Sequence, residues 1–174
     1  MKLIKIALAA LILSVAAFPQ TKDLGMGAFS NESGPILMAV DASLVNLDKD
    51  NPYVMFVAFM AAGGDRSVAV AAKDVVLVYK GQEYRMPSVK ELRDAYRGEI
   101  RDLDFYRRLG KEGINASWIR FYDFPERSNF FPTLTLSAPL AASEGHLVGK
   151  RGFMTPLYFK NPGFAKGDTL TIKV

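Results

Sequence analysis

The chain contains no cysteine and only one histidine among its 174 residues. The absence of cysteine excludes disulfide bonds, thiol catalysis, cysteine-based metal centres and a lipid anchor on a cysteine at a signal junction. His146 is therefore the sole imidazole base, and no Gly-x-Ser-x-Gly sequence presents a serine nucleophile to it. We therefore predict an exposed surface histidine, no catalytic residues, no metal site and no cofactor.

Carboxylates could still form two kinds of site, a calcium site or a glycoside hydrolase site, but the sequence supports both only weakly. The Asp48–Asn51 segment begins like a calcium loop, but it lacks the later glycine and the bidentate glutamate of such a loop. Glycoside hydrolysis needs two carboxyl groups about 5–9.5 Å apart across a cleft. Candidates for such a pair exist, but nothing in the sequence fixes their separation: Asp41, Asp123 and Glu126. A carboxylate-based hydrolase is thus the least favoured class.

The N-terminus has the pattern of an export signal. Lys2 and Lys5 precede an apolar run over residues 6–15, and Ala16 and Ala17 follow as small residues. This order predicts a secretory signal peptide over residues 1–17, cleaved after Ala17. The run is shorter than the roughly 20 apolar residues that span a bilayer, which argues against an uncleaved anchor. No later segment offers 18 consecutive apolar residues, so we expect no membrane span in the mature chain. The short, plain signal favours a bacterial protein that is periplasmic or extracellular.

The basic character of the chain comes partly from this signal. The formal net charge is +4, and the signal holds two lysines and no acid, so the mature chain carries 4 − 2 = +2. Proteins that bind nucleic acid concentrate far more positive charge on one face. We therefore predict no nucleic-acid partner.

Strand-like segments dominate the rest of the chain. Residues 18–34 are polar and rich in glycine, which predicts a flexible lead-in, and residues 35–174 form a single predicted domain. Alternation over 36–45 and an apolar stretch at 53–60 predict a strand followed by a central strand. Further segments continue an antiparallel meander to Pro87, with a tight hairpin at Lys80-Gly81. Later strands are expected at 118–124, 130–137, 146–148, 153–160 and 169–174.

One amphipathic helix interrupts the strands at about 88–109. Ser88 and Glu91 have the spacing of a capping box, and apolar residues recur at three- and four-residue steps until Gly110. The opposite face is charged and includes an i, i+4 row that would suit an anionic partner: Arg93, Arg97 and Arg101. Acidic residues interleave with this row, so a solvated face is the simpler explanation.

Short strands joined by Gly, Pro and Asn turns look like an antiparallel immunoglobulin-type β-sandwich at the level of architecture, with the helix inserted between strands. A small barrel closed by the helix is the alternative fold. Aromatic residues gather in the segment after the helix. They predict core packing on one strand face and rings offered to a partner on the other, giving these candidate binding residues: Trp118, Arg120, Tyr122, Phe124, Phe130 and Phe131.

Together these features predict an exported, non-enzymatic binding module of the bacterial envelope. The helix and the 124–131 loop would contact a protein or a glycan, and the sequence does not set the oligomeric state. The alternative is a structural accessory that joins an envelope assembly through an edge strand, for which the 169–174 strand is the candidate.

Overall fold

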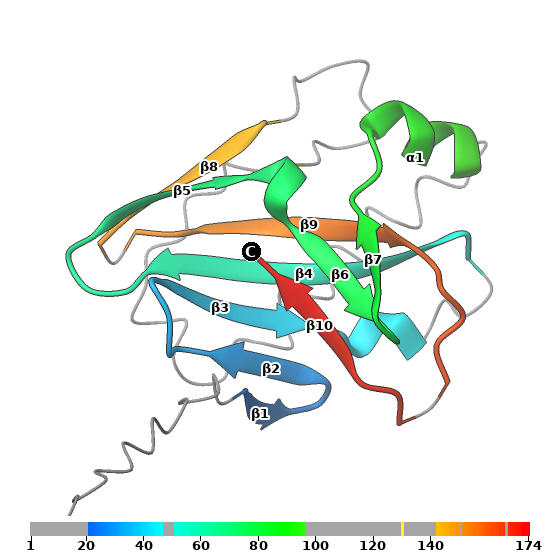
Figure 1. The fold of residues 1–174 in the computed structure, drawn as a ribbon, viewed down its shortest axis with the longest axis horizontal. Coiled ribbons are helices and arrows are strands. Elements are labelled where there is room, and N and C mark those ends of the chain that lie inside the picture. Colours follow the sequence, from blue (N-terminus) through cyan, green and yellow to red (C-terminus); the bar gives the residue numbers. More distant parts are fainter. Residues whose placement is uncertain (1–20, 47–50, 97–129, 131–141, 150, 166) are drawn as a thin grey trace, which may run out of the picture.

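The computed structural model describes residues 21–46, 51–96, 130, 142–149, 151–165 and 167–174. In this part of the chain the fold is mainly β, with antiparallel sheets and one α-helix, as predicted (Figure 1). The predicted signal peptide, residues 1–17, lies outside the described residues. So does the predicted strand at 118–124.

The largest sheet has five antiparallel strands in the order β1-β2-β3-β4-β9. Their bounds are β1 Lys22–Gly25, β2 Ala28–Asn31, β3 Ile36–Asp41, β4 Tyr53–Ala62 and β9 Phe153–Lys160. Every residue of β4 after Tyr53 is buried, because β3 and β9 flank the strand and both of its faces are covered. The prediction of a central strand at 53–60 is confirmed.

The expectation that residues 18–34 are a flexible lead-in is wrong for residues 22–31. These residues form the β1–β2 hairpin, which turns at Gly25, Met26 and Gly27, all with positive φ, and pairs onto β3. Only small side chains of β2 point inward, namely Ala28 and Ser30. Without large apolar residues, the segment lacks the hydrophobic alternation that identifies a strand in sequence.

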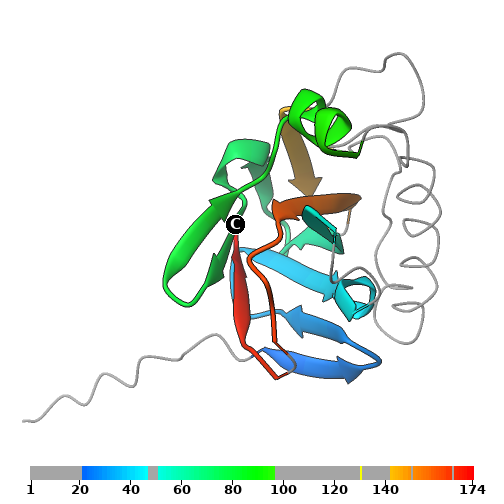
Figure 2. The same ribbon diagram turned by 90° about the vertical axis from the view of Figure 1, so that its right-hand side faces the viewer.

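A second sheet has three strands in the order β10-β6-β7, with β6 Val76–Tyr79, β7 Gln82–Arg85 and β10 Leu170–Lys173. The β6–β7 turn confirms the predicted hairpin, since Lys80 and Gly81 have φ of 48° and 80°. Two successive positive φ angles are those of a type I′ turn, which suits the twist of paired strands. Figure 2 shows this sheet to one side of the five-stranded sheet.

The meander ends at β4, earlier than the sequence predicts. The next strand, β5 (Ser67–Ala71), leaves the sheet and pairs with β8 (Glu144–Val148) in a two-stranded ribbon. It cannot pair with β4, because β3 and β9 occupy both edges of that strand. Two short 3₁₀ turns complete the described elements: η1 Ser43–Asn46 after β3 and η2 Ala72–Asp74 after β5.

The loop before β10 is fastened to the end of β6. The hydroxyl of Tyr79 donates to the carboxylate of Asp168, and the Tyr79 ring packs edge-on against Phe164 at 5.0 Å between centroids. Lys80 lies 3.6 Å from the same carboxylate. The Tyr79 hydrogen bond is the main reason why the pKa of Asp168 is lowered. This cluster holds β10 in register at the edge of the three-stranded sheet.

Candidate functional site

Two of the nine predicted binding residues lie in the described part of the chain, Arg93 and Phe130. The others lie outside the described residues: Arg97, Arg101, Trp118, Arg120, Tyr122, Phe124 and Phe131. The site can therefore be built from the start of the helix and from the surfaces that the described strands present.

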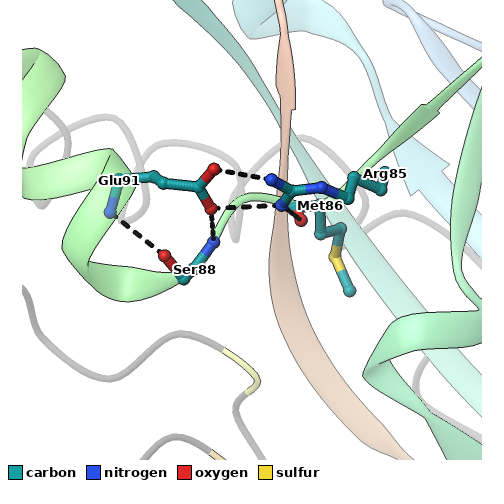
Figure 3. Close-up of polar contacts among 4 residues, drawn as sticks. All are labelled: Arg85, Met86, Ser88 and Glu91. Atoms are coloured by element: carbon teal, nitrogen blue, oxygen red, sulfur yellow. Dashed lines mark hydrogen bonds and ion pairs between the residues drawn. The ribbon is translucent and has the colours of Figure 1, made fainter.

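The helix α1 (Val89–Tyr96) starts where the sequence predicts, and its predicted continuation to 109 lies outside the described residues. The capping box is confirmed (Figure 3). The Glu91 N–H donates to Ser88 Oγ at 3.1 Å, and the Ser88 N–H donates to Glu91 Oε2 at 2.8 Å. Each side chain thus satisfies a backbone donor that the first helical turn would leave unpaired.

Arg85, at the end of β7, extends this cap into a link between strand and helix. Its guanidinium binds both carboxylate oxygens of Glu91, at 2.6 and 3.1 Å, and donates to the carbonyl of Met86 at 3.0 Å (Figure 3). The Arg85 guanidinium and then the Ser88 N–H lower the pKa of Glu91 to about 2. A bidentate pair constrains direction as well as distance, so it fixes how the chain enters the helix.

The described turns of α1 have an inner and an outer side. Leu92 is fully buried and Val89 packs against the core, whereas Lys90 and Asp94 are exposed and pair at 3.4 Å in an i, i+4 contact. Arg93 is half-buried and already interacts with another residue of the protein. The first arginine of the predicted row is therefore engaged within the fold, and the outer side begins with Lys90 and Asp94.

Phe130 is a core residue and not an exposed recognition ring, which corrects its place among the candidate binding residues. It is 3% exposed, and its ring packs edge-on against Phe153 at 5.4 Å between centroids. Its backbone N–H donates to Thr155 Oγ1 at 3.0 Å. Aromatic character alone could not separate these roles, because a ring that fills a core and a ring that meets a ligand have the same sequence signal.

The described acid and base groups occupy very different environments. His146 is exposed on β8, as predicted, with Nε2 3.9 Å from Glu144 Oε2. Asp41 is 1% exposed, and its Oδ1 accepts the Ser43 N–H at 2.8 Å at the start of η1. Asp123 and Glu126 lie outside the described residues. Among the described residues, no three His, Cys, Asp or Glu side chains gather as metal ligands.

A hollow that the sequence did not indicate lies where the β2–β3 and β4–β5 connections meet. The Gly63 N–H donates to the carbonyl of Pro35 at 2.9 Å, which holds the two connections together. A Cβ at Gly63 would lie 2.9 Å from the carbonyl oxygen of Gly34, so this contact needs glycine. The hollow has a volume of about 550 Å³, and Glu32 and Arg66 are its charged lining residues.

Comparison with known proteins adds no assignment to this geometry. No protein-family model, curated protein or solved structure matches the chain. In the described part of the chain, no helix has the length and apolar character needed to cross a membrane. Inferences about function therefore rest on the residues and their arrangement.

Proposed function

We propose that the protein is an exported, non-enzymatic binding module of the bacterial envelope, in which the helix that begins at Val89 contacts the partner. One observation carries this proposal. The entry into α1 is fixed by the Arg85–Glu91 pair and the Ser88 cap, while Lys90 and Asp94 stay exposed on its outer side. A contact element held in a set direction loses less conformational entropy on binding.

The proposed scaffold is an immunoglobulin-like β-sandwich in its layers. Support comes from the three-stranded sheet, which lies to one side of the five-stranded sheet (Figure 2). The likeness does not extend to strand order, because β1 to β4 are sequential neighbours, whereas immunoglobulin sheets use Greek-key connections. Export, to the periplasm or beyond, is proposed from the N-terminal sequence pattern alone.

The non-enzymatic assignment rests on the distribution of reactive groups. The one histidine of the chain sits on an exposed strand face beside Glu144. The carboxylate of Asp41 is buried, so it does not face a cleft that would admit a substrate. These environments favour a binding role over a carboxylate-based hydrolase, since a catalytic pair must meet its substrate across a cleft.

The test is capture of partners from native envelope, with variants on the outer side of α1. The double variant Lys90→Gln/Asp94→Asn removes two exposed charges without a change in net charge. Lys73→Gln/Asp74→Asn is the matched control, because these residues are also exposed and opposite in charge but are chain neighbours on η2. A deletion of residues 88–110 removes the whole predicted helix.

We expect the control to retain every partner, the Lys90/Asp94 variant to lose those that contact α1, and the deletion to lose them as well. Circular dichroism of each variant verifies that the sheets are intact. Equal capture by the folded deletion variant and the unchanged protein would refute the helix as contact element.

One observation favours a second candidate, a structural accessory that pairs through an edge strand. β10 is an edge strand of the described three-stranded sheet. However, β10 is only four residues long, and its Lys173 pairs with Glu83 at 2.8 Å across the sheet. Short edge strands that carry lysine resist pairing with a strand of another chain. If Thr171→Lys abolished capture and the α1 variants did not, the edge-strand role would replace the helix proposal.

A further inference from the structure

The hollow between the β2–β3 and β4–β5 connections is far from the proposed helix contact. In Figure 1 both connections lie at the left end of the five-stranded sheet, and α1 lies at the upper right. The hollow therefore belongs to neither the α1 junction nor the β10 edge. Its volume of about 550 Å³ falls within the range of about 300–1,000 Å³ that is usual for small-molecule sites.

Its two charged side chains have opposite signs and no partner among the described residues. Glu32 and Arg66 are both exposed, and neither forms a hydrogen bond or salt bridge through its side chain with any described residue. Other opposite charges of the described surface do meet, as in Lys173–Glu83 and Lys90–Asp94. Here the two charges line one hollow without meeting, so both remain available to a ligand.

The rest of the lining consists of Ser33, Pro35, Leu37 and three glycines. The backbone at Arg66 is held by its carbonyl, which accepts the Gly149 N–H at 2.9 Å. The hydrogen bond from the Gly63 N–H to the Pro35 carbonyl holds the β2–β3 connection in place, and Pro35 and Leu37 supply the apolar part of the lining. A small ligand that carries both charges and an aliphatic portion would match this lining.

We propose that this hollow binds a small zwitterion, with the ligand's ammonium group at Glu32 and its carboxylate at Arg66. A guanidinium offers a planar pair of donors that matches a carboxylate, and a glutamate accepts hydrogen bonds from an ammonium group. The chemistry is shared by free amino acids and by short peptides with both ends unblocked. Both charged contacts are exposed to solvent, so each contributes little binding free energy. We therefore expect weak binding in which the charge pattern of the ligand determines selectivity.

The test measures binding to the protein purified after expression of the whole chain, by NMR chemical shifts of the Gly63 and Gly64 amides. The probes are trialanine, its N-acetylated form, its C-terminal amide and free alanine. The first three share the trialanine sequence and differ in which end carries a charge, and free alanine separates the amino-acid source from the peptide source. Arg66→Gln and Glu32→Gln remove one charge each, and Lys73→Gln and Asp74→Asn serve as exposed controls.

We expect trialanine to bind more tightly than either blocked form. Arg66→Gln should weaken trialanine roughly fivefold, the effect of one well-placed exposed ion pair, and should remove the preference over the amide. Glu32→Gln should remove the preference over the acetylated form, and both controls should behave as the unchanged protein.

Equal binding of the blocked and unblocked peptides would overturn the proposal, as would failure of every probe to shift the two glycine amides. An unchanged preference in both Arg66→Gln and Glu32→Gln would also overturn it. None of these results bears on α1: the Lys90→Gln/Asp94→Asn variant should bind trialanine normally. The proposed function and this site can therefore fail independently.

Discussion

Replacement of Gly145 by alanine should destabilise the protein through a single steric conflict. Gly145 lies on β8 directly over the ring of Phe153 in β9. A Cβ at this position would lie 2.2 Å from Cε1 and 2.3 Å from Cζ of that ring, far inside van der Waals contact. The ring cannot retreat easily, because Phe153 is fully buried and packs edge-on against Phe130.

The expected cost follows from this overlap. Extra carbon in a packed core costs about 1–3 kcal/mol of unfolding free energy. For a domain of this length that corresponds to a fall in Tm of roughly 2–12 °C. Gly145 is not among the residues with positive φ, so backbone strain adds nothing to the steric term. Thermal and urea unfolding measure the change, with a lower midpoint and an unchanged m-value.

Two further variants make the reasoning refutable. Gly34→Ala is the matched control, because its Cβ would lie 3.7 Å from the nearest atom and its φ is ordinary, so stability should stay within about 0.5 kcal/mol. Phe153→Leu removes the ring atoms that the new methyl group meets. The double variant Gly145→Ala/Phe153→Leu should therefore lose less stability than the sum of the single variants. Additive losses, or a neutral Gly145→Ala, would refute the clash.

Three other predictions concern the helix cap, a buried hydroxyl and the N-terminus. Because the pKa of Glu91 is lowered from its usual 4.5 to about 2, its stabilising contacts persist above pH 4.5 and are lost as the pH falls towards 2. Thermal unfolding from pH 6 to 2 should show Glu91→Gln lacking this part of the acid sensitivity, and identical pH profiles would contradict the assignment. Ser30 Oγ is buried without a hydrogen-bond partner among the described residues, so Ser30→Ala should raise the unfolding free energy by about 1 kcal/mol in urea, whereas a loss would reveal a partner. Mass spectrometry of the exported protein should show 157 residues beginning at Phe18, since 174 − 17 = 157, and an intact N-terminus would rule out cleavage after Ala17.

Local features were predictable because the interacting residues are close in the chain. The Ser88–Glu91 cap joins residues three apart, and the Lys80-Gly81 turn needs only two residues that reach positive φ. The buried strand β4 was equally clear, since an apolar segment that continues on both faces is stable only between two other strands. These elements depend on near neighbours or on simple burial.

The candidate site depended much more on contacts that pattern cannot specify. Arg85 binds Glu91 across the junction between a strand and a helix, and no periodicity links the two residues. The aromatic signal at Phe130 was real, but only its packing on Phe153 assigns the ring to the core. The hollow at Glu32 and Arg66 combines two connections that are more than 25 residues apart in the chain.

The mainly β character, the start of the helix and the hairpin turn could be predicted from sequence, because propensity, capping and alternation act over a few residues. The pairing of β5 with β8, the addition of residues 22–31 to the main sheet, and the sharing of one hollow by Glu32 and Arg66 became visible only in the folded protein. These outcomes depend on which strand edges remain free once β4 is enclosed. Competition for free strand edges is a property of the whole fold, so it cannot be predicted from the sequence of any single segment.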